Sequence, residues 1–404
     1  MKILVSGGPV HAKLDAVKFV TNRFKGGLMA KLADELKVQG VSVTYLCSKG
    51  STKPMNPELK SHVPSEFNKD IEVVYHDGFH DYRSKVMEMA PEFDAIVLGA
   101  AVANLIPVGY WKTEMKDMDS KEWIDTVAQV RNGECPEAYV PMPLQGKFPS
   151  HNFKPGDTIR MDWQIAPRII DEVRQHMKKG ATLFGFKLLG GAPHDELITA
   201  AYEVLLGSGA VNVFANDVTN LNVCYGVGKD RSEREILRDY LAEEIIKLAT
   251  DKYYATEVCG ELPEGWDNDA RLWAYAARDR FVKSPEGFVY GSVAFRNKTG
   301  FTTTKRGKNE TEGAVIVMSV DHEKRIIRTR GGKATLNAPL LDHIFKSNSE
   351  VDHILHYHDQ VDGLPTYYWS PPGTVRDANR PAHTSFNIGG HGCYLLLDKD
   401  GNQL

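Results

Sequence analysis

Short apolar runs rich in β-branched residues alternate with helical stretches through the first 260 residues, and this alternation constrains the fold more than any other feature. It is typical of a mainly parallel, doubly wound α/β sheet with helices on its faces. The predicted strands are Lys2–Ser6, Val41–Leu46, Ile71–Tyr75, Ala95–Leu98, Thr182–Phe186 and Val211–Phe214.

Two helices are predicted in the same region. Over Gly27–Val38, Leu28, Leu32 and Leu36 recur every four residues and form one apolar stripe, so this helix is expected to pack on the sheet. The charge-rich segment Ser232–Thr250 is also predicted to be a helix.

The length of 404 residues exceeds what one hydrophobic core supports, so at least two domains are expected. The turn-forming segment 260–265 separates a first domain, residues 1–260, from a second, residues 266–404. The second begins with a helical run, Leu272–Phe281, and contains a helix near Ala338–Lys346, which indicates a mixed α/β layer structure. Its predicted strands are Phe288–Phe295, Ala314–Ser319, Arg325–Thr329, Ile354–Tyr357 and Cys393–Leu397.

Charge and cysteine usage favour small-molecule partners. A formal net charge of −4 gives no general attraction to nucleic acid or to an anionic membrane. Five scattered cysteines without a Cys-x-x-Cys pair indicate reduced thiols rather than a disulfide framework. The apolar run at the amino terminus is too short for a signal sequence or membrane span, so a cytoplasmic location is expected.

The segment Pro107–Pro149 interrupts the pattern with Met, Trp, Lys and Asp residues that follow no clear period. Long structureless loops are uncommon in compact domains unless they have a role. Its apolar residues, Trp111 and Trp123 among them, need a surface to cover them, so the segment is a candidate contact in a homodimer or higher homo-oligomer.

The first strand runs into Ser6-Gly7-Gly8, and Asn22 to Gly27 leads into the predicted helix. Glycines allow the close approach of an anion, and a helix amino terminus offers N–H groups and positive potential, so a phosphate or carboxylate site is one interpretation. The alternatives are a tight connection that needs glycine and an Asn22 side chain that caps the helix.

An ordered set of segments is more specific than any one of them: Ser6–Gly8, Asp15–Arg23, Ala100–Asn104, Gly185–Leu188 and Ala215–Val218. In order and separation these segments resemble the phosphopantothenoylcysteine synthetase family, and Gly146–Ser150 resembles its lysine-bearing segment. The resemblance covers residues 1–255. It implies a Rossmann-like fold and a ligase that activates a carboxylate, such as 4′-phosphopantothenate, with a nucleoside triphosphate and transfers it to an amine such as cysteine.

By motif position, the resemblance implies that Asn22 orients the acyl nucleotidylate, that Lys18 lies near the substrate and that Lys147 faces the phosphates. The implied nucleotide-binding residues are Gly7, Gly8, Ala100, Ala101, Asn104, Phe186, Lys187, Asn216 and Asp217. The expected cofactor is Mg²⁺ with ATP or CTP.

Two departures from the family bear on the nucleotide and acyl pockets. Asn104 stands where the family usually has aspartate, and Leu188–Gly191 lacks its Glu-Thr pair. Simpler interpretations also stay open, because a lysine at a strand end such as Lys187 is usually solvated and Asn216-Asp217 is a common strand-to-turn pair.

Three histidines mark the second domain. His356 and His358 alternate on a predicted strand and point to the same side, and His391 follows in a Gly-His-Gly segment. If they converge, they suit zinc or another divalent metal with one open position. A single His-x-His pair is also often an ordinary feature of a half-buried strand.

These histidines lie in segments that resemble the class II aldolase/adducin-like family: Gly291–Arg296, Gly300–Thr303, Leu355–His358 and His391–Gly392. The resemblance covers residues 268–400. Asn337 stands at the position of the family's acid/base glutamate, and an amide cannot accept and return a proton at neutral pH. Metal binding with weak or absent aldol cleavage is therefore expected.

Three readings of function follow. The leading one is the amide-forming ligase with an accessory or altered second domain. The second is a metal-dependent aldolase- or epimerase-type lyase with a domain that only binds nucleotide. The third is a non-catalytic scaffold.

Overall fold

The computed structural model describes residues 1–54, 71–111, 120–132, 134, 139–156, 159–266, 281, 289–307 and 313–404. The chain divides into two compact units. Residues 1–186 and 207–210 form the first, and residues 187–206 and 211–404 form the second. The division predicted between residues 1–260 and 266–404 stays a prediction.

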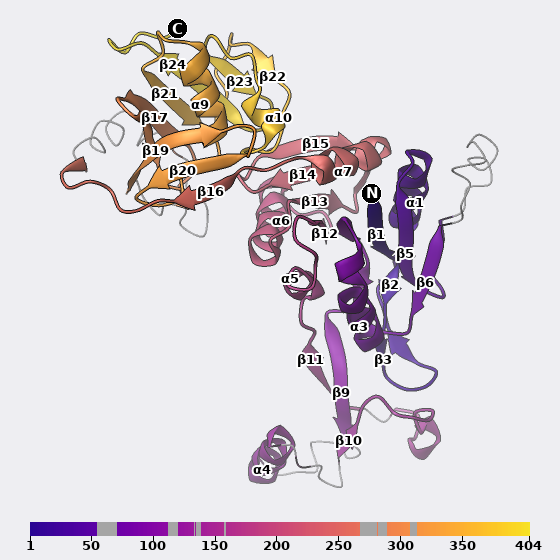
Figure 1. Cartoon of the computed structure of the whole chain (residues 1–404). Coiled ribbons are helices and arrows are strands. Elements are labelled where there is room, and N and C mark those ends of the chain that lie inside the picture. Colours follow the sequence, from indigo (N-terminus) through magenta and orange to yellow (C-terminus); the bar gives the residue numbers. More distant parts are fainter. Residues whose placement is uncertain are drawn as a thin grey trace. The chain divides into compact units, whose positions relative to one another are not determined.

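A parallel sheet forms the centre of the first unit, with the strand order β12-β7-β1-β5-β6. Figure 1 labels four of these strands, β12, β1, β5 and β6. The side chains of β7 are fully buried, as expected for parallel strands covered on both faces. The predicted α/β class with a parallel, Rossmann-like sheet is confirmed for this region. The strands are β1 (Lys2–Gly7), β5 (Ser42–Ser48), β6 (Glu72–His76), β7 (Ala95–Leu98) and β12 (Thr182–Leu189).

Helix α1 (Gly27–Val38) has the predicted bounds and buries Leu32 and Leu36 against β1 and β5. Other helical elements described in this unit include α3 (Phe79–Met89), η2 (Ala90–Glu92), η4 (Ser150–Asn152) and α5 (Ile169–Val173). Two small strand pairs lie beside the sheet: β2 (Pro9–Val10) with β8 (Ala101–Val102), and β3 (Ala12–Lys13) with β4 (Phe19–Val20).

The segment Pro107–Pro149 contains regular structure, which corrects its interpretation as a stretch without a period. It includes most of β9 (Leu105–Trp111), α4 (Ser120–Arg131) and β10 (Tyr139–Pro141), and β9 pairs antiparallel with β10 and with β11 (Met161–Ile165). Residues 112–119, 133 and 135–138 lie outside the described part. Pairing with β11 organises the segment, and sequence periodicity within the segment cannot reveal such a partner.

The second unit begins at Lys187, in the last part of β12. It includes most of α6 (His194–Ser208) and an antiparallel meander of β13 (Asn212–Asp217), β14 (Asn220–Gly228) and β15 (Glu233–Leu237). The single helix predicted over Ser232–Thr250 is wrong in its first third. That third forms β15, and η5 (Arg238–Tyr240) and α7 (Leu241–Thr250) follow. Cross-strand pairing with β14 overrides the helical propensity of this charged stretch.

A nine-stranded, mostly antiparallel sheet follows, in the order β16-β20-β19-β18-β17-β21-β24-β23-β22. Helix α9 (Ala338–Ser347) supplies Leu340, Leu341, Ile344 and Phe345 to its main core. The helical run predicted over Leu272–Phe281 lies outside the described residues apart from Phe281. The elements are β16 (Ala255–Val258), β17 (Ser292–Asn297), β18 (Gly300–Thr304), β19 (Ala314–Asp321), β20 (Ile326–Arg330), β21 (His353–Tyr357), β22 (Thr366–Tyr367), α10 (Val375–Ala378), β23 (Phe386–Ile388) and β24 (Gly392–Leu397).

Among the residues that the structure describes, no helix has both the length and the apolar character needed to cross a membrane.

Candidate functional site

The glycine turn after β1 is a place of close backbone approach. Gly8 and Gly26 both have positive φ, +77° and +86°, and a Cβ at Gly26 would lie 2.3 Å from the Gly8 nitrogen. A Cβ at Gly7 would overlap the Tyr45 hydroxyl. Only glycine therefore allows β1 to meet the start of α1, which supports the tight-connection interpretation. Gly7 and Gly8 are themselves buried.

The turn is joined directly to the Ala100–Asn104 segment. The Ala101 N–H donates to the Gly8 carbonyl at 2.9 Å, and β2 and β8 continue this pairing in parallel. Ala100 is half-buried and Asn104 is exposed. The structure thus brings Gly7, Gly8, Ala100 and Ala101 together at one edge of the first unit.

Asn22 is fastened to the same edge. Its Nδ2 donates to the carbonyl oxygens of Ala101 and Val102, both at 3.1 Å. The residue before α1 is Gly26, and no side chain caps the helix, so Asn22 is not the helix cap. The side-chain N–H groups instead hold the loop before α1 against β8.

Lys18 and Lys147 lie on two segments that Asp15 ties together. Asp15 is buried, and its carboxylate accepts hydrogen bonds from the N–H groups of Val17, Lys18 and Phe148. The Lys18 N–H bond contributes most to holding the pKa of Asp15 well below its usual range, against the opposing effect of burial. The Lys18 ammonium lies 3.5 Å from the same carboxylate. Lys147 directly precedes Phe148 in the sequence, and its side chain is exposed.

Asp15 has a structural role that the motif comparison did not assign. Its sequence signal was its place in the Asp15–Arg23 segment, but its partner Phe148 is distant in sequence, and only the folded chain shows that contact.

The other nucleotide-site residues lie on β12 and the β13–β14 turn. Phe186 and Lys187 are half-buried on the carboxyl-terminal half of β12. Asn216 accepts a hydrogen bond from Arg238 and donates to the Phe214 carbonyl.

Asp217 forms the turn between β13 and β14. Its carboxylate accepts from the N–H groups of Thr219 and Gly191, and these bonds lower its pKa. The Asn216-Asp217 pair therefore does form a strand-to-turn connection in the second unit.

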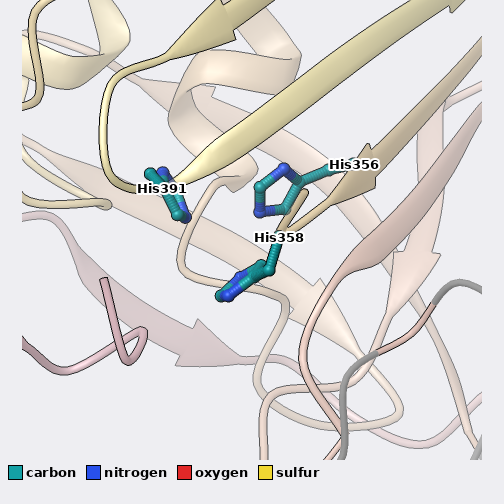
Figure 2. A group of neighbouring side chains, drawn as sticks. All are labelled: His356, His358 and His391. Atoms are coloured by element: carbon teal, nitrogen blue, oxygen red, sulfur yellow. The ribbon is translucent and has the colours of Figure 1, made fainter. Parts of the chain in front are cut away.

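The second unit brings His356, His358 and His391 together. One ligand atom from each lies within 4.8 Å of the others. His356 lies on β21, His358 directly follows that strand, and His391 lies in the turn between β23 and β24, and Figure 2 shows the three rings side by side. The turn requires glycine, because a Cβ at Gly392 would lie 1.8 Å from the Tyr357 carbonyl oxygen.

His356 is held as a neutral imidazole with a defined tautomer. Its Nδ1 lies 3.0 Å from the Cys393 carbonyl oxygen, so Nδ1 carries the proton and Nε2 keeps its lone pair. Burial, reinforced by His391 and His358, holds the pKa of His356 well below its usual range. A neutral imidazole is the form that binds a metal.

A carboxylate also reaches this cluster. Asp230 lies in the β14–β15 connection, and its Oδ2 is 2.9 Å from the His391 Nε2, although the two atoms are not aligned as a hydrogen bond. Burial acts to raise the pKa of Asp230, but His391, His358 and the Ser232 hydroxyl hold it well below its usual range. Sequence reasoning missed Asp230, since no motif places it near the histidines.

Buried ring nitrogens without hydrogen-bond partners show whether the histidine cluster suits a metal ion. The His356 Nε2 and both ring nitrogens of His391 are buried without a hydrogen-bond partner. Buried polar atoms without partners are costly, and a bound cation would satisfy the lone pair of one nitrogen in each ring. The donor set of three imidazoles suits zinc and neighbouring transition metals, so the residues fit.

Comparison with known proteins agrees with the resemblance of the amino-terminal region. Residues 1–132 match the family model described as the DNA/pantothenate metabolism flavoprotein C-terminal domain. Over 257 residues, the chain is 24% identical to the coenzyme A biosynthesis bifunctional protein CoaBC of Thermococcus kodakarensis, which covers 61% of this chain and 51% of that protein. The chain spans about half the length of this curated relative.

Solved structures give weaker likenesses. The DNA/pantothenate metabolism flavoprotein from Streptococcus pneumoniae is 20% identical with a TM-score of 0.46, covering 61% of this chain and 96% of that one. YgbL from Escherichia coli, named as a candidate aldolase, epimerase or decarboxylase, is 12% identical with a TM-score of 0.25, covering 32% of this chain and 76% of that one. Residues 1–132 thus carry a domain similar to the C-terminal domain of the pantothenate flavoprotein family.

Proposed function

We propose that the chain is an amide-forming ligase that uses a nucleoside triphosphate to make an acyl nucleotidylate, with phosphopantothenate and cysteine, or a related acid and amine, as substrates. The observation that carries this proposal is the match of residues 1–132 to a pantothenate-metabolism domain. The linkage of Gly8, Ala101 and Asn22 at one edge of the first unit supports it, because these residues come from separate segments of the ordered set.

In this proposal the chain contributes position and charge rather than a strong base. The carboxylate oxygen of the acid attacks the α-phosphorus, pyrophosphate leaves, and the amine nitrogen then attacks the acyl carbon and releases the nucleoside monophosphate. Lys18 and Lys147 would offer positive charge to the substrate and the phosphates, and Asp15 keeps their two segments together. Mg²⁺ bound to the triphosphate would offset its remaining charge.

The direct test measures pyrophosphate release from ATP and, separately, from CTP. Release that requires both the acid and the amine, together with a trapped acyl nucleotidylate detected by mass spectrometry, is the expected result. Turnover of carbonyl substrates with metal but no acid-dependent release would favour the lyase reading. The absence of both activities would favour the non-catalytic scaffold.

Asn22→Asp is expected to slow amide formation by roughly 100-fold while changing the first half-reaction much less. The new carboxylate would face the Ala101 and Val102 carbonyl oxygens and an adjacent acyl phosphate, and like charges repel. Isotope exchange between pyrophosphate and the triphosphate reports the first step, and amide formation reports both. The exposed Asn152→Asp serves as the control. An equal loss in both steps would reduce Asn22 to a structural role.

We further propose that the histidine cluster binds a divalent metal in a class II aldolase-like domain whose aldol activity is weak. The observation behind it is the convergence of His356, His358 and His391, with buried ring nitrogens of His356 and His391 that have no hydrogen-bond partner. Asn337 is buried, with its Oδ1 unpaired, and cannot exchange a proton as glutamate does.

A homodimer or higher homo-oligomer is proposed, with the region around β9 and α4 as the contact. Large apolar side chains are exposed there: Leu105, Val108, Ile124, Trp163 and Ile165. Ile165 pairs with Leu105 across the β9–β11 ladder, so Ile165→Asp is expected to shift the parent's dimer toward monomer in light scattering at micromolar concentration. A monomeric parent would contradict the proposal.

A further inference from the structure

Two arginines reach across β14 to asparagines of β13 in the same way. Arg234 lies on β15, and its Nη2 donates to the Asn212 Oδ1 at 3.1 Å. Arg238 directly follows β15, and its Nη2 donates to the Asn216 Oδ1 at 3.0 Å. The second pair therefore repeats the first, one helical-turn length further along the sequence and nearer the end of β13.

The two guanidinium groups differ in their counter-charge. Arg234 forms an ion pair with Glu244 of α7, and its guanidinium lies 3.6 Å from the centre of the Trp369 ring. Arg238 is half-buried and, within the described part of the chain, forms no ion pair with a carboxylate. Burial lowers the pKa of Arg238. A partly buried cation without a counter-charge is costly, so this position suits an anionic ligand.

Arg238 is attached where β12 and β13 end. The Val218 N–H, directly after β13, donates to the carbonyl of Leu189, the last residue of β12, at 3.1 Å. The carboxyl ends of the two strands therefore lie side by side, and Arg238 is bonded to Asn216 at this edge. In open α/β sheets, ligands bind outside the carboxyl ends of the strands.

Asn216 is better placed to orient Arg238 than to touch a ligand. The residue is 4% exposed, although the family resemblance implies that it binds nucleotide. Its Nδ2 donates to the Phe214 carbonyl and its Oδ1 accepts from Arg238, so both ends of the amide are engaged within the protein.

We propose that Arg238 binds a phosphate group of a substrate, with Asn216 as the positioning residue that orients the guanidinium. The inference rests on the proposed ligase function, which brings two phosphorylated substrates to the chain, the nucleoside triphosphate and the phosphorylated acid. A guanidinium stays charged at neutral pH and donates charge-assisted hydrogen bonds to phosphate oxygens. Because Nη2 is engaged by Asn216, the Nη1 amino group would donate to the phosphate.

Calorimetric titration of the full-length protein with ATP, CTP and 4′-phosphopantothenate, each alone, tests the assignment. Arg238→Gln removes the charge but keeps an amide that can donate to Asn216, and it is expected to bind the phosphate-bearing ligand roughly tenfold more weakly or worse. A loss for ATP or CTP alone assigns the group to the triphosphate, and a loss for 4′-phosphopantothenate alone assigns it to the acid. Arg238→Lys should recover most of the affinity, and added salt should weaken binding to the parent more than binding to Arg238→Gln.

Arg234→Gln is the matched control, because it removes the equivalent arginine whose charge Glu244 already balances. It should lower the melting temperature but keep the parent's affinities. An equal loss of affinity in Arg234→Gln and Arg238→Gln would give Arg238 a structural role only. Unchanged affinities in Arg238→Gln, beside a parent that releases pyrophosphate with acid and amine, overturn the inference and leave the proposed function standing. A parent that binds none of the three ligands overturns both.

Discussion

Protein purified without chelators is expected to contain close to one divalent metal ion per chain, and a His356→Ala/His358→Ala double variant close to none. The two imidazoles come from the end of one strand and supply two of the three histidine ligands, so the remaining His391 cannot hold the ion with useful affinity. Elemental analysis of the two proteins, purified side by side, measures the effect.

His353→Ala is the matched control for the double variant, because His353 lies on the same strand but outside the cluster. Its metal content should equal the parent's. Equal metal in the parent and the double variant, or none in the parent, would remove the site. Brisk aldol turnover by the metal-loaded parent would leave the site standing and refute only the interpretation of Asn337.

The metal should also stabilise the second unit. An ion present at a thousandfold excess over its dissociation constant adds about 4 kcal/mol to the free energy of unfolding, provided that it binds only the folded chain. Chelation of the parent should therefore lower the melting temperature, while the double variant should melt at one temperature with or without chelator.

Local pattern predicted most of the regular structure. Helix α1 begins and ends where its leucine spacing indicates, and β7 has its predicted bounds, because one apolar stripe or one buried run decides each of them. The prediction failed at β15, where alternating glutamates and arginine resemble a helix surface. Pairing with β14 decides that segment, and a partner strand is not visible in the local pattern.

In the candidate sites too, features set by the local pattern were predicted and features set by distant contacts were not. Strand alternation predicts that His356 and His358 share a side, and a glycine-flanked histidine suggests the third member. The roles of Asp230 and Asp15 were not predicted from the sequence, because each residue contacts a partner that is distant in sequence. Asp230 contacts His391, and Asp15 accepts a hydrogen bond from Phe148. Neither contact has a sequence signature, so both depend on the folded chain.

The first unit should lose stability as the pH falls from about 6.5 to 4, and His76 should cause much of the loss. Its ring is buried, packs against Tyr82, and has both nitrogens without a hydrogen-bond partner. Burial, with smaller effects of His11 and Lys85, lowers the pKa of His76 to about 4, although Asp81 and Asp77 oppose the shift. In the unfolded chain the same ring titrates near 6.5.

Between these two pKa values the unfolded chain binds a proton that the folded chain does not, so acid favours unfolding in this window and has no such effect above it. At pH 4 and below, the loss in the free energy of unfolding reaches roughly 3 kcal/mol. His76→Phe keeps a ring at this position without a titrating group. Between pH 7 and 4, the free energy of unfolding of this variant should therefore fall by roughly 3 kcal/mol less than that of the parent. Hydrogen exchange of the β1 and β7 amides measures opening of this unit alone, with the exposed His80→Gln as control. Equal acid sensitivity in His76→Phe and the parent would show that other groups govern the transition.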